Sequence, residues 1–323
     1  MNFPPEIAKL GHVHLVTPDL TKSLWFFHEL LGLEITERTE TTVYLRANME
    51  REHHSLVLEQ GDRARLDHVG WRAKRPEDVE AFARLLRERG TEVTPIAAGT
   101  EVGLGDGIRF QLGTGHKFEI YYDVDKPEAP PELRSVLKNQ VYRSWNRGCA
   151  VRRIDHVNLW TTLDIEPFHD WLAESLGFKM RELVTAPQGR VGGWMSVTPL
   201  VHDVAIMRAG PHETTTARLH HLAYWLDNAQ DVLRGADILV EAGVKPDQGP
   251  GKHGASQAFF LYVRDPGSGH RVELFSNGYL IFDPDWEPIE WSGAEIPTAL
   301  TAWGPTDYVP HTDDNVMNTT TEA

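Results

Sequence analysis

Cysteine is nearly absent from this chain: Cys149 is the only one among 323 residues. A disulfide within the chain is therefore impossible, and a thiolate metal site is not expected. No stretch reaches the roughly 18 apolar residues that a membrane helix needs. Residues 1–10 lack the basic and apolar segments of a signal peptide. We therefore expect a cytoplasmic protein with no membrane partner.

Basic residues are also scarce relative to acidic ones. Lys and Arg total 32 against 47 Asp and Glu, which gives a formal net charge of −15. Such a charge disfavours binding to nucleic acid, whose phosphates attract basic surfaces. Hydrophobic residues make up 41% of the chain and charged residues 24%, as in ordinary globular proteins. The length suits about two domains of roughly 150 residues each.

Four strand-like segments with histidine near their start recur along the chain. They read L-G-H-V-H-L-V-T from Leu10, L-D-H-V-G-W-R-A from Leu66, I-D-H-V-N-L-W-T from Ile154 and L-H-H-L-A-Y-W-L from Leu219. A helical pattern follows each one, over 20–31, 76–88, 165–175 and 229–242, and a glycine follows each helix. A further strand comes next, at 33–36, 91–95, 178–183 and 244–245. The sequence thus predicts four β-α-β units.

The four units pair into two halves. The first half closes with H-K-F-E-I-Y-Y from His116 and the second with H-R-V-E-L-F from His270. His68 lies 51 positions before Glu119, and His221 lies 52 before Glu273. We infer an α+β protein of tandem β-α-β-β-β modules from a gene duplication. The expected domains are 1–130 and 150–290, with a tail at 291–323. A linker at 124–153 contains a short helix ending at residue 139, and residues 312–323 are expected to fray.

The second half offers His156, His221 and Glu273 on three separate strands. Two imidazoles and one carboxylate form the ligand set that leaves half of an Fe(II) coordination sphere open. His221 is preferred to its neighbour His220 by register, because it precedes Leu222 as His156 precedes Val157. The sequence thus predicts a metal site in the second half.

Several motifs in the second half occur in the order found in one enzyme family. They are D-H-V-N from Asp155, W-M from Trp194, V-H-D from Val201, L-H-H-L from Leu219, G-P-G-K-H-G from Gly249, A-F-F-L-Y from Ala258 and D-P-G-S-G-H-R-V-E from Asp265. With these motifs the chain resembles the extradiol ring-cleavage dioxygenases of the vicinal oxygen chelate superfamily, such as catechol and homoprotocatechuate 2,3-dioxygenases. The resemblance implies the glyoxalase-like fold, a small aromatic diol and O2 as substrates, and a homotetramer.

The resemblance also implies roles for individual residues. It assigns His156, His221 and Glu273 to Fe(II), with Mn(II) as an alternative; His202 to acid–base catalysis; Tyr262 to a hydrogen bond with a substrate oxygen; His253 and Asn158 to the pocket lining; and Trp194 to packing on the ring. His253 is also expected to take part in catalysis.

Two arginines that bind a substrate carboxylate in the homoprotocatechuate enzymes have no match here. Gln248 stands at one position, and S-G-A-E-I-P-T-A-L at 292–300 replaces the other stretch. An anionic side chain would lack its charge-assisted partners. We therefore expect catechol or an alkyl- or halo-substituted catechol as substrate and 2-hydroxymuconic semialdehyde as product, with homoprotocatechuate as the alternative.

The first half contains a similar triad, His12, His68 and Glu119, without sequence counterparts of the V-H-D and G-K-H-G motifs. The resemblance implies that this half is metal-free, with the triad residual. Rival functions within the superfamily are a non-catalytic drug-binding protein, a glyoxalase-type isomerase, a fosfomycin-modifying transferase and hydroxyphenylpyruvate dioxygenase. The first would need no metal triad, and the last has a longer C-terminal ending.

Overall fold

A computed structural model describes residues 4–144, 147–210 and 216–305. The frayed end expected at 312–323 lies outside these residues. The first half consists of β1 (Ile7–Thr17), α1 (Leu20–Leu24), a π-helical segment (Trp25–Leu30), β2 (Glu34–Arg38), β3 (Thr42–Arg46), β4 (Leu56–Gln60), β5 (Arg65–Ala73), α2 (Pro76–Glu88), β6 (Val93–Ile96), β7 (Gly107–Gln111) and β8 (Lys117–Tyr121).

The second half repeats this order of elements and then extends it. It consists of β9 (Arg153–Thr161), α3 (Glu166–Leu176), β10 (Lys179–Ala186), β11 (Gly189–Ser196), β12 (Val204–Arg208), β13 (Arg218–Leu226), α4 (Ala229–Glu241), β14 (Gln248–Lys252), β15 (Ala258–Arg264) and β16 (Arg271–Asn277). After it come β17 (Ile289–Ser292), a 3₁₀ turn (Gly293–Glu295) and α5 (Ile296–Leu300).

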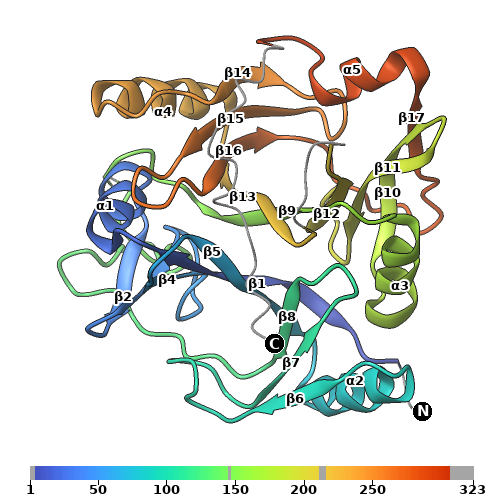
Figure 1. The fold of residues 1–323 in the computed structure, drawn as a ribbon. Helices are drawn as coiled ribbons and strands as arrows, with labels where there is room; N and C mark the ends of the chain where they lie inside the picture. Colours follow the sequence, from blue (N-terminus) through green and yellow to red (C-terminus); the bar gives the residue numbers. More distant parts are fainter. Residues whose placement is uncertain (1–3, 145–146, 211–215, 306–323) are drawn as a thin grey trace.

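Each half forms one sheet, and the two sheets have the same strand order. The first runs β2-β3-β4-β1-β5-β8-β7-β6, and the second runs β10-β11-β12-β9-β13-β16-β15-β14 with β17 added beside β10. In Figure 1 the blue-to-cyan half lies below the yellow-to-red half, and β1 and β9 meet in the middle. The α+β fold with two duplicated halves is therefore confirmed.

Glycine ends each of the three long helices, α2, α3 and α4, and the π-helical segment, much as the sequence predicts. Gly32, Gly90, Gly177 and Gly243 all have positive φ, between 77° and 85°. An L-residue with a side chain resists this conformation, so glycine stops the helix and turns the chain into the next segment. At the other end of α4, the Asn228 side chain accepts a hydrogen bond from the Asp231 N–H at 3.0 Å, which satisfies one unpaired donor of the first turn.

Two predicted elements are wrong. No strand forms at Val244–Lys245, because the Val244 N–H donates to the Leu239 carbonyl and closes the end of α4; strand β14 begins only at Gln248. No helix ends at residue 139 either. Backbone hydrogen bonds from Arg143 N to Leu133 O, and from the Ser135 amide to Val141 O, fold this part of the linker back on itself. In both places local turn bonds replace the predicted structure.

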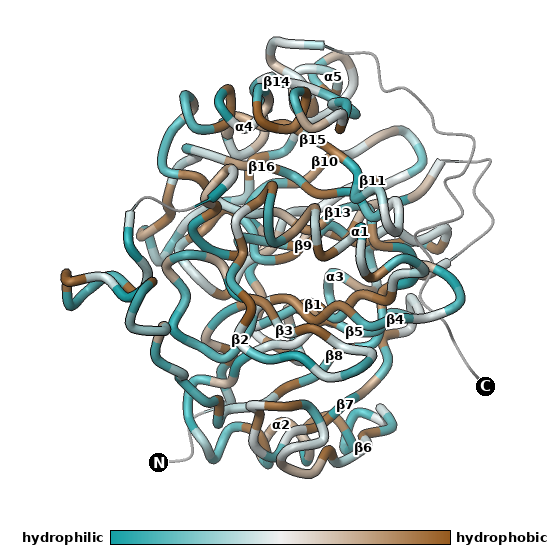
Figure 2. The backbone as a smooth tube through the Cα atoms, turned by 90° about the vertical axis from the view of Figure 1, so that its left-hand side faces the viewer, coloured by the Kyte–Doolittle hydropathy of each residue, from teal (hydrophilic) through white to brown (hydrophobic). Residues whose placement is uncertain are grey.

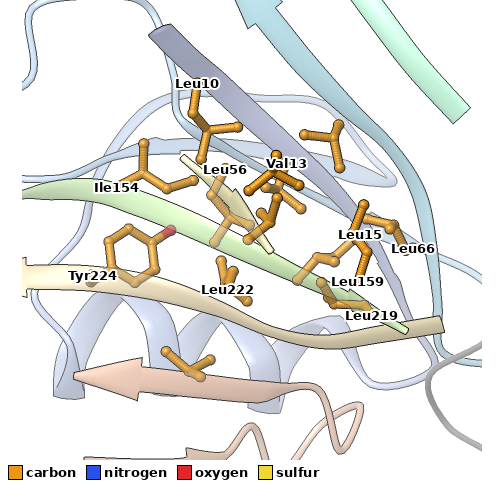
Figure 3. Close-up of a cluster of buried hydrophobic side chains, with 14 of the residues drawn as sticks. Leu10, Val13, Leu15, Leu56, Leu66, Ile154, Leu159, Leu219, Leu222 and Tyr224 are labelled. Atoms are coloured by element: carbon orange, nitrogen blue, oxygen red, sulfur yellow. The ribbon is translucent and has the colours of Figure 1, made fainter. Parts of the chain in front are cut away.

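One continuous core joins the two halves. Buried side chains of β1, β4 and β5 pack against those of β9 and β13; Figure 3 shows Leu10, Val13, Leu15, Leu56, Leu66, Ile154, Leu159, Leu219, Leu222 and Tyr224. Figure 2 shows the apolar, brown stretches within these inner strands and teal residues on the outer loops. The strands that supply the predicted metal ligands are therefore among the most firmly packed parts of the chain.

Two buried histidines hold the halves together at corresponding positions. Just before β8, His116 Nε2 lies 3.0 Å from the Arg218 carbonyl of the other half, and just before β16, His270 Nε2 lies 3.1 Å from the Val16 carbonyl. Burial lowers the pKa of each to about 4. Each ring is therefore a neutral N–H donor across the junction between the halves at neutral pH.

These two histidines should make the protein less stable in mild acid. The folded pKa of about 4 lies below the ordinary value of 6.5, so the unfolded chain takes up a proton first as the pH falls. Stability is therefore lost between pH 6.5 and 4, at roughly 2 kcal/mol per histidine between pH 7.5 and 5. Urea unfolding at both pH values measures this. His116→Gln keeps a donor but cannot titrate, and an unchanged pH slope in this variant would contradict the prediction.

Candidate metal centre

Three neighbouring strands of the second sheet each contribute one side chain of a metal-binding type to a single point. His156 lies in β9, His221 in β13 and Glu273 in β16. The His156 and His221 Nε2 atoms are 3.2 Å apart, and Glu273 Oε2 lies 3.0 Å and 3.2 Å from them. The three form one of the groups that could hold a metal ion. Their mutual distances are near the roughly 3 Å expected of ligands bound at about 2.0–2.2 Å.

The group is buried, and its charges are balanced within it. Burial disfavours a charge on His156, but hydrogen bonds with Asp155 and Glu273 outweigh it and raise the pKa to about 9. Burial lowers the pKa of His221 to about 4. Burial also disfavours the Glu273 carboxylate, but the surrounding imidazoles hold its pKa well below the usual range. An anionic carboxylate facing two ring nitrogens is the donor set that a divalent cation needs.

Side chains behind the ligands fix their orientation. Asp155 Oδ1 accepts a hydrogen bond from His156 Nδ1 at 2.9 Å, which turns Nε2 toward the centre. His220 Nδ1 lies 2.7 Å from His221 Nδ1, and Arg271 donates to the Nε2 of His220 at 2.7 Å. The Asp155–His156 pair is the carboxylate–histidine arrangement typical of metal sites.

His220 shows that strand register alone does not predict which side chains line the cavity. It is absent from the ligand group, as predicted, yet its ring lines the same cavity as His221. The pairing of β13 with β9 shifts between Leu219 and His221, which disturbs the strict alternation of faces. His220 instead stacks on Trp160, with ring centroids 4.3 Å apart.

The group opens into a cavity of about 440 Å³. Every predicted site residue lines this cavity: His156, Asn158, Trp194, His202, His221, His253, Tyr262 and Glu273. A larger cavity of about 650 Å³ lies between the halves, but none of the predicted site residues lines it. The smaller cavity is therefore the candidate site.

The V-H-D segment before β12 carries His202 to the cavity. Asp203 accepts hydrogen bonds from the Val197 and Thr198 amides at 2.8 Å and 3.1 Å, which fixes the loop. The His202 ring then lies with its centroid 3.9 Å from that of His156. Burial lowers the pKa of His202 well below its ordinary value, so the ring is neutral in this structure.

Tyr262 and His253 form a hydrogen-bonded pair beside Glu273. Tyr262 is paired with Glu273 across β15 and β16, and its hydroxyl lies 3.1 Å from His253 Nε2. His253 Nδ1 donates to the Leu300 carbonyl at 2.5 Å, and its Nε2 also lies 3.3 Å from Glu273 Oε1. Burial raises the pKa of Tyr262 well above its usual value, so it is an O–H donor.

The far wall of the cavity comes largely from residues that the sequence did not single out. Ile296, Pro297, Ala299, Leu300 and Thr301 of the C-terminal segment line it, together with Trp160 and Met207. Strand β17 pairs with β10, and the Gly254 and Ala255 amides donate to carbonyls at 298–299 in α5, which holds the segment against the second half. The isolated apolar residues within 292–300 are the sequence feature that could have predicted this contact with the cavity.

Both halves of the chain match known family models. Residues 153–274 match the model described as the Glyoxalase/Bleomycin resistance protein/Dioxygenase superfamily, and residues 66–125 match the Catechol 2,3-dioxygenase-like N-terminal domain. None of the helices in the described ranges is long and apolar enough to cross a membrane.

Several known proteins are similar over nearly the whole chain. A manganese-dependent 2,3-dihydroxybiphenyl 1,2-dioxygenase of Geobacillus genomosp. 3 is 58% identical, over 93% of this chain and 95% of that protein. A metapyrocatechase of Geobacillus stearothermophilus is 37% identical, over 92% and 90%. The crystal structure of homoprotocatechuate 2,3-dioxygenase from Arthrobacter globiformis superimposes with a TM-score of 0.83 at 31% identity, over 95% and 91% of the two chains.

Proposed function

The chain belongs to the extradiol ring-cleavage dioxygenases of the vicinal oxygen chelate superfamily, and from that premise we propose that it opens catechol and catechols with apolar substituents next to the diol. Catechol would give 2-hydroxymuconic semialdehyde. The observation that supports this proposal best is that three converging ligand atoms lie in the wall of a largely apolar cavity. Membership of this family leaves the drug-binding and isomerase alternatives without support.

In this proposal His156, His221 and Glu273 bind Fe(II) or Mn(II), since two imidazoles and a carboxylate suit either ion. When bound, the ion would lower the pKa of the diol hydroxyls and hold the diol beside O2. The rigid strands and the Asp155 hydrogen bond keep the three ligand atoms in place.

Proton handling falls to the side chains around the ligands. A diol oxygen that enters between Tyr262 and His253 would meet the tyrosine hydroxyl on one side and the His253 imidazole on the other. In its neutral form this imidazole can take up a proton from the diol. His202 is a neutral imidazole beside His156 and can hold or release one proton at the other end of the site.

The cavity walls favour an apolar substituent on the ring. Among the lining residues that the structure describes, Arg271 is the one arginine, and its guanidinium already has partners. Its Nε donates to Asp247 at 2.6 Å, and its two Nη groups donate to His220 and Gln248 at 2.7 Å and 3.1 Å. A carboxylate on the substrate would therefore be buried without a partner, at a cost of about 3 kcal/mol or more.

We expect a strong preference for uncharged diols, including bulky ones. The relative that is 58% identical is named for 2,3-dihydroxybiphenyl, and Trp160, Met207 and Ile296 would enclose such a second ring. Homoprotocatechuate is the second candidate, because the structurally similar enzymes are named for it. Arg271 already donates hydrogen bonds to Asp247 and His220, which argues against homoprotocatechuate as the substrate.

The test is a spectrophotometric assay of ring fission with protein loaded separately with Fe(II) and Mn(II). Catechol, 3-methylcatechol and 2,3-dihydroxybiphenyl should give the yellow product with kcat/KM at least about 100-fold above those of protocatechuate and homoprotocatechuate, which corresponds to the roughly 3 kcal/mol above. Faster turnover of homoprotocatechuate would overturn the substrate proposal and leave the reaction type intact. The cytoplasmic location and the homotetramer stay predictions.

A further inference from the structure

The first half contains a buried cluster at the position that corresponds to the candidate metal centre. Val13 pairs with Leu56 in the first sheet as Val157 pairs with Val204 in the second, and Gly70 pairs with Glu119 as Ala223 pairs with Glu273. These registers match the two halves residue by residue. The matched pairs are His12 and His156, His68 and His221, Glu119 and Glu273, His54 and His202, and Arg109 and Tyr262.

The match includes one residue for which the sequence gave no sign. His54 precedes β4 by two positions as His202 precedes β12, although no V-H-D motif surrounds it. The imidazoles of the cluster are fully buried, because His12 and His68 are 0% exposed. A Cβ at Gly70 would lie 2.1 Å from His12 Cε1, so this glycine leaves the space that the His12 ring fills.

The two sites differ in which carboxylate faces the imidazoles. Glu119, the counterpart of Glu273, is bound by the Arg109 guanidinium, whose Nε donates to it at 3.0 Å. The carboxylate that faces the imidazoles in place of Glu119 belongs to Glu101, in the loop between β6 and β7. Glu101 is buried, whereas residues 97–100 before it are all exposed. Loops seldom bury a carboxylate unless something compensates its charge.

Glu101 lies directly among the ring nitrogens. Its Oε1 is 3.1 Å from His12 Nε2 and 2.9 Å from His54 Nε2, and its Oε2 is 3.3 Å from His68 Nε2. His12 Nε2 and His68 Nε2 are themselves 3.0 Å apart. These spacings repeat those of His156, His221 and Glu273, and they suit atoms that share one ion.

The histidine orientation is also that of a ligand. His68 Nδ1 lies 2.8 Å from Asp67 Oδ2, so the carboxylate accepts from Nδ1 and the ring presents Nε2 to the centre of the cluster. Asp155 orients His156 in the same way in the other half. This carboxylate–histidine arrangement is the usual partner of a metal-bound imidazole.

We propose that His12, His68 and Glu101 bind a second divalent first-row metal ion, in a closed site that braces the loop between β6 and β7 against β1 and β5. Glu119 belongs to the same group of possible ligands, and His54 flanks Glu101. Imidazole and carboxylate in an enclosed set of this kind suit Zn²⁺. The role of this site is structural, because the ion would link Glu101 of the loop to His12 of β1 and His68 of β5. This inference does not depend on the substrate of the other half.

The alternative is that protons and Arg109 alone stabilise the cluster. Arg109 Nη2 lies 3.8 Å from Glu101 Oε2 and 3.4 Å from His68 Nε2, so its charge is close to both. The two possibilities predict different metal contents. A metal site gives two ions per chain, whereas a proton network gives only the one in the second half.

Metal content after stripping with a chelator, reloading with Zn²⁺ alone and desalting tests the proposal on the full-length chain. Wild-type protein should retain two equivalents of Zn²⁺ by mass spectrometry. Glu273→Gln and Glu101→Gln should each retain one, because each loses a different carboxylate ligand. Glu59→Gln is the matched control: Glu59 accepts a hydrogen bond from His14 beside the cluster but belongs to no ligand group, and it should retain two.

A second measurement avoids variants altogether. Crystals of Zn²⁺-loaded wild-type protein should show an anomalous difference peak among His12, His68 and Glu101 in addition to that at His156. A single equivalent of Zn²⁺ in wild-type protein, or two retained in Glu101→Gln, would overturn the second site. Neither result would bear on ring cleavage, which is measured separately.

Discussion

His221→Ala should abolish ring cleavage and remove the metal ion from the second half. His221 is one of the three proposed ligands, and its Nε2 lies 3.2 Å from both His156 Nε2 and Glu273 Oε2. Loss of a residue that merely orients a ligand typically weakens metal binding 10–100-fold. Loss of the ligand itself should exceed about 100-fold. Metal titration followed by oxygen consumption with catechol measures both effects.

His220→Ala is the matched control for this prediction. His220 is next in sequence and lines the same cavity, but it contacts His221 through Nδ1 and does not belong to the ligand group. Its removal should weaken metal binding by no more than about 100-fold, as expected of a supporting residue. If His220→Ala lost the ion and His221→Ala kept it, the ligand assignment would be wrong.

His202→Phe should leave the metal content unchanged and lower kcat with saturating catechol by about 10²- to 10⁴-fold. This is the usual contribution of a positioned acid–base group. Phenylalanine preserves a buried planar ring beside His156 but cannot hold a proton. Steady-state oxygen consumption by protein of verified metal content gives kcat, and a spectroscopic titration gives catechol affinity.

His202→Gln separates proton handling from packing. The amide can hydrogen bond but cannot shuttle a proton at neutral pH, so kcat should stay low while KM for catechol remains near the wild-type value. A kcat within a few-fold of wild type in both variants would show that His202 only fills space next to His156. Loss of the metal ion in His202→Phe would point to a structural role instead.

Much of the fold could be read from local patterns. Alternating apolar residues marked β1, β5, β9 and β13, and glycines with positive φ ended the helices close to the expected positions. The errors also arose locally, at Val244–Lys245 and in the linker, where turn hydrogen bonds decided the structure. The duplication accounts for the convergence of His156, His221 and Glu273. Their strands, β9, β13 and β16, are neighbours in the second sheet, as β1, β5 and β8 are in the first.

The sequence by itself determined the duplicated modules, the strands that carry the ligand residues, and a chain that belongs among ring-cleavage dioxygenases. Only the tertiary structure revealed that α5 lines the cavity and that Arg271 donates a hydrogen bond to Asp247. It also revealed that Glu101 takes the place of Glu119 among the imidazoles of the first half. The physical reason is distance along the chain. Periodicity and turn residues act over a few positions, whereas these contacts join side chains that only folding brings together.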